Sequence, residues 1–596
     1  MSRARASAEA PLGVACGFSG RPWAWRAAPL DLAQAQAHAE DAVAAGLALA
    51  RGCTEAELER VLRPRLRDWL PDPSAFRDMD AAAERLADAV VRGEAITVFA
   101  DYDVDGATSA AILLRTLRAL GSAPDHYIPD RLLEGYGPTP EALLALAARG
   151  TRLVVLLDCG THAFAALEAA RAAGLEAIVV DHHKAATALP PACAIVNPNR
   201  FDELADGGVA AAHAGLCTAG LAFLLAVALV RALRRRGWFA TRPEPALPAL
   251  LDLVALGTVA DVMPLVGLNR AFVALGLKRL AARANPGLAA LLEVSRLSAA
   301  SARDLGFHLG PRVNAGGRVG TADLGVRLLT TEDPEEARRL AAELDALNAA
   351  RREIEAAVTE AALAAVDPAA PVAVAAGEGW HPGVIGIAAG RLKDRLDRPA
   401  IVIAREGDRP AKGSGRSVPG VDLGAAVLEA RERGLLLAGG GHAMAAGLTV
   451  APHCIPALVA FLAERLGPAL AARPATRPLA VDLSLAPRGL TPALHAALAV
   501  AGPFGAGWPA PRVAVGPVRV VEAAETASGG HVRLLGAGPD GARVRAVMFR
   551  AAATAAGAAL LGARGRLLHL AGEVVRNDWQ GEARAELHLD DAAPAD

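Results

Sequence analysis

The stretch Ile96-Thr97-Val98-Phe99-Ala100-Asp101-Tyr102-Asp103-Val104-Asp105-Gly106 decides the fold. Its first five residues are continuously apolar, which is typical of a strand buried on both faces, and the Ala-rich segment 107–120 that follows predicts a helix. The three aspartates stand at alternate positions between strand and helix. Because such close carboxylates repel one another, the loop is stable only where cations or hydrogen-bond donors neutralise them.

Two further apolar runs along the chain end in the same kind of chemistry. Leu153–Leu157 reads as a strand and runs into Asp158-Cys159-Gly160; 177–180 reads as another and runs into Asp181-His182-His183. A helix is expected between them over 163–173. Strands that alternate with helices predict a parallel sheet covered on both faces, and ligands of such sheets gather at the carboxyl ends of the strands.

A divalent metal would neutralise these acids. A calcium loop of the EF-hand type is excluded, because Ile112 stands where that loop needs a Glu six residues after Gly106. Oxygen ligands with an imidazole suit manganese or magnesium better than structural zinc. Asp261 is a fourth candidate, since it closes an apolar helical segment. A lone aspartate at a strand end is also a common helix cap, and this alternative stays open for each acid taken singly.

In this order, the acidic motifs resemble those of the DHH phosphoesterase superfamily and, within it, the bacterial RecJ family of single-strand exonucleases. The resemblance extends over most of the chain. Its motifs are Asp101–Gly106, Asp158–Gly160, Asp181–His183, 257–261 (GTVAD), 310–318 (GPRVNAGGR), 379–386 (GWHPGVIG), 412–417 (KGSGRS), 439–447 (GGGHAMAAG), 503–507 (PFGAG) and 579–581 (WQG).

The resemblance implies a site for two divalent ions, Mn²⁺ or Mg²⁺. Asp101 would bind one ion, while Asp103, His182 and Asp261 would bind the other. Asp158 would bridge the two ions as the central catalytic residue.

Two further catalytic residues are less directly implied. Asp105 would orient ligands or a water. His183 would contact the scissile phosphate, with a packing role as its alternative. Some phosphatase branches place a histidine four residues before the first aspartate; Thr97 stands there, so the first ion would depend more on water or substrate.

Substrate-binding residues are expected in the Gly-rich motifs, where the backbone can approach phosphate closely. The glycines of 439–442 are expected to precede a helix and to offer their N–H groups to an anion. An ordinary helix-start turn and solvated arginines are the alternatives. The candidates are Arg312, Asn314, Arg318, His381, Ser414, Arg416, Gly441 and His442.

The predicted fold is a multidomain α/β protein with a C-terminal OB-type β-barrel. The expected order is an N-terminal extension over 1–75, a parallel-sheet DHH domain over 76–295, a connecting helical region over 296–365, a second α/β domain over 366–471, and the barrel over 478–596. A long helix over 335–364 would link the two α/β domains. Three aromatic residues of the barrel, Trp508, Phe549 and Trp579, are candidates for stacking on bases or for its core.

Composition adds little about the partner. The 596 residues hold 62 Lys+Arg and 64 Asp+Glu, so a site for a polyanion would have to be local. Six scattered cysteines and an N-terminus without a long apolar core indicate a reducing cytoplasm. The uncharged run Val209–Val230 is long enough to span a bilayer, but its many Ala and Gly residues favour a buried helix.

The sequence therefore predicts a 5′→3′ exonuclease for single-stranded DNA that releases 5′-mononucleotides in repair and recombination. Expected partners are the DNA strand, a helicase and a single-strand-binding protein; a monomer with no membrane association is expected. Two alternatives remain: a DHH phosphodiesterase for short RNA or cyclic dinucleotides, and a catalytically inactive single-strand-binding scaffold.

Overall fold

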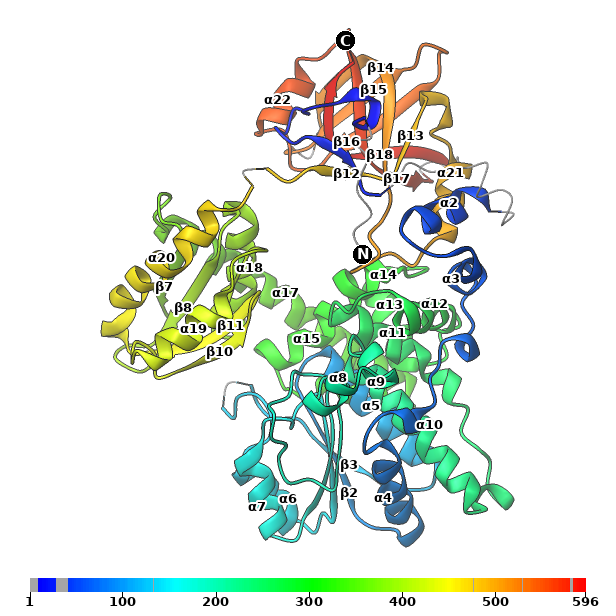
Figure 1. Ribbon diagram of the computed structural model, residues 1–596, viewed down its shortest axis with the longest axis vertical. Helices are drawn as coiled ribbons and strands as arrows, with labels where there is room; N and C mark the ends of the chain where they lie inside the picture. The colour runs from blue at the N-terminus through cyan, green and yellow to red at the C-terminus, as the bar shows by residue number, and fades with distance from the viewer. Residues whose placement is uncertain are drawn as a thin grey trace. The chain divides into compact units, whose positions relative to one another are not determined.

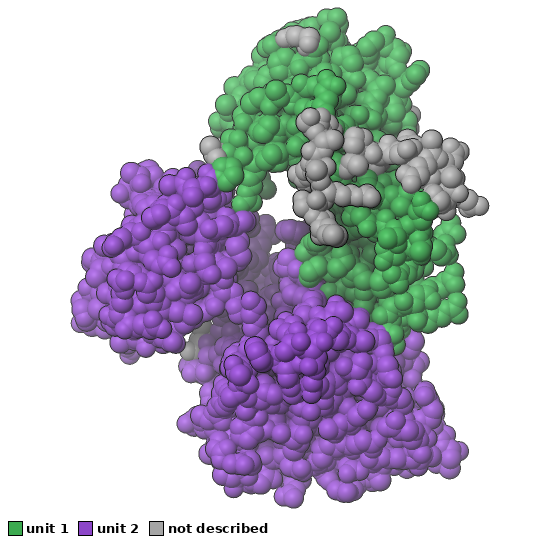
Figure 2. Space-filling view, viewed as in Figure 1, with its two compact units in different colours: residues 1–70, 264–274, 474–596 green, residues 71–263, 275–473 purple. Residues whose placement is uncertain are grey.

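The computed structural model describes residues 9–27, 41–131, 133–474, 476–527, 529–578 and 583–595. The chain divides into two units, coloured green and purple in Figure 2. Unit 1 comprises Met1–Leu70, Pro264–Ala274 and Pro474–Asp596, and unit 2 comprises Pro71–Met263 and Leu275–Arg473. Unit 1 thus joins the N-terminal segment to the C-terminal barrel, while both α/β domains belong to unit 2.

The predicted parallel sheet is present in unit 2, with strand order β3-β2-β4-β5-β6 and all pairs parallel. Every residue of β2 and β4 is buried, which explains their unbroken apolar sequence. The short outer strands β3 and β6 were not predicted. The strands are β2 (Ile96–Ala100), β3 (Asp125–Tyr127), β4 (Leu153–Leu157), β5 (Glu176–Val180) and β6 (Ala194–Val196).

Helices cover both faces of this sheet, and in Figure 1 α6 and α7 lie on one side with α4 on the other. The first pair packs on Phe99, Leu156 and Val179. Helices α5 and α10 contact the sheet and each other. The helices are α4 (Met79–Arg92), α5 (Val104–Ala119), α6 (Pro140–Ala148), α7 (Phe164–Ala172), α8 (Phe201–Asp206), α9 (Val209–Ala212), α10 (Thr218–Arg235) and α11 (Leu251–Ala260).

The uncharged run Val209–Val230 forms α9 and most of α10. Fourteen residues of α10 are buried, so the prediction of a core helix is confirmed. Among the described residues one helical segment, Pro452–Ala471, is long and apolar enough to cross a membrane by length and composition. Its Leu458, Phe461 and Leu462 belong to the core of the second α/β domain.

A helical region connects the two α/β domains, and the predicted long helix is α17 (Pro334–Ala365). Its Leu340 and Leu344 are buried, and it packs along α13 and α15 before it contacts α18. One turn of the region, η7 (Leu305–Leu309), is π-helical. The helices are α12 (Gly267–Ala281), α13 (Pro286–Val294), α14 (Ala302–Asp304), α15 (Gly310–Val319) and α16 (Leu324–Thr330).

The second α/β domain has the sheet order β10-β11-β9-β8-β7, in which only β7 and β8 are parallel. The prediction that Gly439–His442 opens a helix is wrong: these residues belong to β10, a hairpin strand paired with β11. The elements are β7 (Ala373–Glu378), α18 (Ile385–Leu396), β8 (Ala400–Arg405), β9 (Ala411–Arg416), α19 (Leu423–Glu432), β10 (Ala438–His442), β11 (Ala445–Val450) and α20 (Ile455–Ala471).

The C-terminal strands form the predicted barrel in unit 1. The order β14-β15-β16-β18-β17 closes because β17 also pairs with β14, and β13 (Leu483–Leu485) adds to β14. Closure of these five strands encloses an apolar core. The strands are β14 (Arg512–Glu525), β15 (Val532–Ala537), β16 (Arg543–Met548), β17 (Leu567–Asn577) and β18 (Arg584–Pro594).

The N-terminal segment is part of the same unit. Its strand β1 (Trp23–Trp25) pairs in parallel with β12 (Leu479–Val481), which precedes the barrel. Helices α2 (Ala42–Ala50) and α3 (Leu58–Leu62) follow it, and α2 packs on α21 (Pro492–Val500). Arg51 and Arg26 from this segment both bind the carboxylate of Asp482.

Candidate metal centre

Three strand ends of the parallel sheet bring the predicted acids together. Asp101 follows β2, Asp158 follows β4, and Asp181-His182-His183 follow β5. Asp261 reaches the same place from the C-terminal end of α11. Three groups of side chains could each hold a metal ion, because the ligand atoms within each group lie within 4.8 Å of one another. Asp158 belongs to two of these groups, and His182 also belongs to two. The groups are Asp101-Asp103-Asp158, Asp105-His182-Asp261 and Asp158-His182-His183.

Two buried carboxylate oxygens of this cluster accept no hydrogen bond. Asp101 Oδ1 and Asp261 Oδ2 are buried without a hydrogen bond from any described residue. Buried polar atoms are normally satisfied, so such orphan acceptors call for an ion. His182 Nε2 lies 3.4 Å from Asp158 Oδ1 and 3.5 Å from Asp261 Oδ2. Oxygen donors with an imidazole fit Mn²⁺ or Mg²⁺.

The electrostatics agree with a cation site. Burial and the neighbouring carboxylates raise the pKa of both Asp101 and Asp158 well above the ordinary range. Burial, followed by the charges of Asp105 and Asp103, raises the pKa of Asp261 to about 8. Without a nearby cation, these carboxyl groups do not all ionise at once, because their negative charges repel one another. A bound cation would favour the ionised carboxylates instead.

The backbone aims Asp158 into the cluster. Its φ of 61° lies in the left-handed region, and Gly160 follows with φ of 109°. Asp158 Oδ1 accepts a hydrogen bond of 3.1 Å from Thr218 Oγ1 at the start of α10. Tyr136 Oη donates to the Asp158 carbonyl at 2.9 Å. Neither Thr218 nor Tyr136 was predicted from the sequence, because each lies in a segment distant from the acidic motifs.

Asp103 and Asp105 have structural partners as well. Asp103 Oδ1 caps α5 by accepting from Asp105 N and Gly106 N. Both oxygens of the buried Asp105 accept backbone N–H groups of α10, from Thr218 at 2.7 Å and Ala219 at 2.9 Å. Asp105 therefore fixes the start of α10 beside Asp158.

His183 is held by the aspartate of its own motif. Its Nδ1 lies 2.7 Å from Asp181 Oδ1, and Asp181 also accepts the backbone N–H groups of Thr161, His182 and His183. Burial alone would lower the pKa of His183, but the bond to Asp181 outweighs it and raises that pKa to about 9. The sequence placed Asp181 at the right strand end without assigning it this positioning role.

Three arginines form a cationic cluster in unit 2. Arg318, on α15, donates to the Gly383 carbonyl, and Arg416, at the end of β9, donates to Ser414 Oγ. Burial and the charge of Arg131 lower the pKa of both, to about 10 for Arg318. In the described part of the chain no carboxylate pairs with either guanidinium within 4.0 Å. Arg131 was not predicted.

The remaining predicted binding residues lie in different surroundings. Arg312 donates hydrogen bonds to Asp345 Oδ1 at 2.8 Å and to the His308 carbonyl at 2.7 Å. It lies in helix α15 and not in a loop. Asn314 lies in the same helix. His381 Nδ1 accepts from Gly383 N, beside Arg318. Burial, followed by the charges of Lys184 and His183, lowers the pKa of His442.

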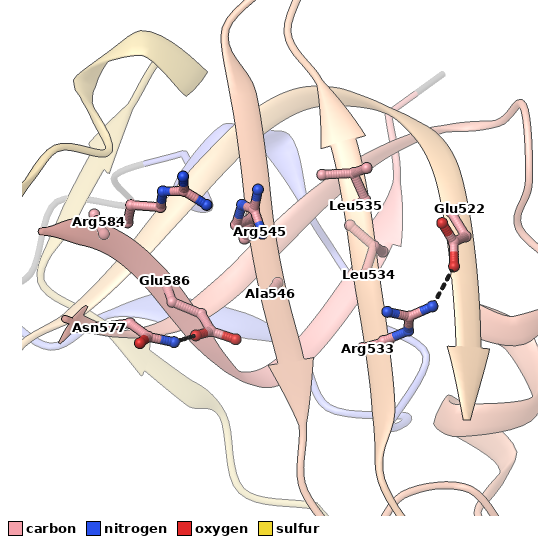
Figure 3. Close-up of a pocket in the computed structure, with 10 residues that line it drawn as sticks. Glu522, Arg533, Leu534, Leu535, Arg545, Ala546, Asn577, Arg584 and Glu586 are labelled. Atoms are coloured by element: carbon pink, nitrogen blue, oxygen red, sulfur yellow. Dashed lines mark hydrogen bonds and ion pairs between the residues drawn. The ribbon is translucent and has the colours of Figure 1, made fainter. Parts of the chain in front are cut away.

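The barrel carries arginines and, among its described residues, one exposed aromatic side chain. Figure 3 shows Arg533, Arg545 and Arg584 around a hollow on β15, β16 and β18, with Glu522 paired to Arg533. Phe549, at the end of β16, is half exposed between His531 and His588. Trp508 is buried under Arg51 and Arg270. Trp579 lies outside the described residues.

Comparisons with known proteins agree with the whole architecture. The chain matches the DHH family N-terminal domain over 95–258, the DHHA1 domain over 369–467 and the RecJ OB domain over 481–591. It is 41% identical over 470 residues to the single-stranded-DNA-specific exonuclease RecJ of Dickeya dadantii (strain 3937), covering 76% of this chain and 80% of that protein.

Solved structures give the same match. The crystal structure of RecJ in complex with Mn²⁺ from Thermus thermophilus has a TM-score of 0.79 and 31% sequence identity, covering 95% of this chain and 79% of that one. The corresponding complex with Mg²⁺ has a TM-score of 0.72 and 30% identity, covering 96% and 78%. The ions in both complexes are those that the donor set favours.

Proposed function

Because this chain belongs to the RecJ family of single-stranded-DNA-specific exonucleases, we propose that it hydrolyses single-stranded DNA from the 5′ end and releases 5′-mononucleotides. The observation that carries the proposal is the cluster of strand-end carboxylates with two orphan buried oxygens, Asp101 Oδ1 and Asp261 Oδ2. Its cellular setting would be repair and recombination.

Two divalent ions, when bound, would lower the pKa of an attacking water and neutralise charge on the attacking and leaving oxygens. Asp101 would hold one ion, and Asp103, His182 and Asp261 would hold the other, with Asp158 between them. Asp105 would orient a ligand, which is one of the roles predicted for it, because both its oxygens accept backbone N–H groups of α10. It would keep Thr218 Oγ1 in place to orient Asp158.

His183 would act on the substrate. With Nδ1 bound to Asp181, Nε2 is the nitrogen that can donate to an oxygen of the scissile phosphate. Its raised pKa keeps the ring protonated at neutral pH, which favours an anionic partner. This is electrostatic stabilisation by a fixed donor.

The arginine cluster would bind the terminal phosphate. Burial and the charge of Arg131 lower the pKa of Arg318 and of Arg416, and a bound anion would relieve the repulsion between these cations. Ser414 Oγ lies beside Arg416 and adds a neutral donor. A phosphate held there would select a strand end over an internal position.

The test uses one oligonucleotide labelled at its 5′ or 3′ end, as DNA, as RNA and as a blunt duplex, with Mn²⁺, Mg²⁺ or EDTA. We expect mononucleotide release from the 5′ label of single-stranded DNA, dependent on metal and lost in Asp158→Ala. Asp252→Asn, a change at a buried acid outside the cluster, is the matched control. Release that starts at the 3′ label would refute the polarity, and activity in EDTA or in Asp158→Ala would refute the metal mechanism.

A further inference from the structure

Phe307 is an exposed aromatic side chain on an unusual turn. Its side chain is 71% exposed, whereas Leu305 and Leu309 at the two ends of the same turn are fully buried. The turn is η7, the π-helical segment between α14 and α15. Such turns are rare and often occur at functional sites. The apolar neighbours anchor the turn, so packing does not explain why its most exposed position carries a phenyl ring.

The turn rests on the backbone that carries the metal-binding acids. A Cβ atom on Gly306 would lie 3.3 Å from Val259 Cγ1, and one on Gly310 would lie 3.4 Å from Ala260 Cβ and 3.9 Å from Val104 Cγ2. Ala260 precedes Asp261, and Val104 stands between Asp103 and Asp105. The turn that presents Phe307 is therefore in contact with two of the segments that form the metal centre.

Arg312 also holds the turn, through a hydrogen bond to the turn and another to α17. Arg312 Nη1 donates to the His308 carbonyl at 2.7 Å, and Arg312 Nε donates to Asp345 Oδ1 of α17 at 2.8 Å. The His308 carbonyl of this turn is thus bound by a side chain that also binds the long helix. These two hydrogen bonds hold the turn that carries the Phe307 ring.

An arginine accompanies the ring. The guanidinium carbon of Arg303 lies 5.3 Å from the centroid of the Phe307 ring, and Arg303 is itself exposed. An aromatic ring beside a guanidinium is the combination that binds single strands, because the ring stacks on a base while the cation contacts the backbone phosphate.

We propose that Phe307 is a positioning residue that stacks on a base of the DNA strand close to the scissile phosphate, with Arg303 contacting the strand beside it. This inference rests on the proposed function. Every base has a π-face, so such a contact fixes the strand without selecting its sequence. It would help to hold the reacting phosphate at the metal centre after each nucleotide is released.

The test measures the Kd of a 12-nucleotide single-stranded DNA by fluorescence anisotropy in EDTA, where cleavage does not interfere. Phe307→Ala should raise Kd about 5- to 150-fold, the range that corresponds to about 1–3 kcal/mol per stacked base, and Phe307→Trp should restore binding. Trp238→Ala is the matched control: Trp238 also carries an arginine, Arg242, at 3.9 Å, but lies beyond the far end of α10. It should leave Kd unchanged.

A set of strands with one abasic site at each of the first six nucleotides gives the decisive readout. At one position, or two adjacent ones, the abasic site should weaken wild-type binding, and Phe307→Ala should then add no further loss. A loss from Phe307→Ala that is the same at every abasic position would refute stacking, as would an equal loss in Trp238→Ala. Failure of the wild type to degrade single-stranded DNA would refute the proposed function instead, and this is measured separately with the end-labelled strands.

Discussion

Binding of Mn²⁺ to the metal-free protein at pH 7 should release protons, and Asp261→Asn should remove about one of them. Asp261 is largely buried beside other acids, so its pKa is raised from 3.8 to about 8. At pH 7 the folded, metal-free protein therefore holds this carboxyl group mainly in its protonated form. A metal binds the carboxylate, so the proton must leave.

The magnitude follows from the pKa. With a pKa of about 8, the group is about 0.9 protonated at pH 7 and about 0.1 protonated at pH 9. Asp101 and Asp158, whose pKa values are also raised, add to the release. Because a raised pKa favours the protonated fold, Asp261 makes the metal-free protein lose stability as the pH rises from about 4 to about 8. Metal affinity should rise over the same range.

The assay is isothermal titration calorimetry with Mn²⁺ in buffers of different ionisation enthalpy, at pH 7 and pH 9. Wild-type protein should release about one proton or more at pH 7 and fewer at pH 9. Asp252→Asn is the control: burial raises the pKa of Asp252 to about 6, and it lies on the same helix but outside the cluster. Equal proton release from wild type and Asp261→Asn, or release that does not change with pH, would refute the assignment of Asp261.

Three further changes test other parts of the structure. Thr218→Val removes the donor to Asp158 Oδ1 and should weaken Mn²⁺ binding about 10- to 100-fold with little loss of stability, whereas unchanged affinity would deny Thr218 its orienting role. Gly257→Ala would place a Cβ 2.4 Å from Thr108 Oγ1 and 2.7 Å from Ala219 Cβ, so it should lower the free energy of unfolding of unit 2 by about 1–3 kcal/mol in urea titrations; an unaltered midpoint would contradict this. Arg270→Met leaves three carbonyls of residues 501–503 without their donor and should destabilise unit 1 by about 3–5 kcal/mol while Mn²⁺ binding stays normal.

Much of the metal centre could be predicted from the sequence, because its ligands follow the most regular elements. Strands buried on both faces must be apolar throughout, so β2 and β4 begin and end at the predicted residues. Parallel strands then bring Asp101 and Asp158 to one edge. The closed barrel was predictable for a related reason, since several short strands follow one another at regular spacing.

What the sequence did not reveal depends on contacts between distant segments. The glycines of β10 carry no periodic pattern, and only pairing with β11 makes them a strand. Arg312 looked available for phosphate, but its partner Asp345 is 33 residues away. Thr218 begins a run that is notable mainly for its apolar character, and its hydroxyl contacts an aspartate 60 residues earlier. Side-chain partners of this kind require the fold itself.

The pairing of β1 with β12 has a consequence for the order in which the chain can fold. Trp23 lies opposite Leu479, and all of unit 2 is encoded between the two segments of unit 1 that contain them. During synthesis at roughly 5–20 residues per second, Trp23 must wait roughly 20–90 seconds until Leu479 is made. The α/β unit, including the metal centre, can therefore be completed first. Strand β1 therefore leaves the ribosome long before β12, the strand with which it pairs.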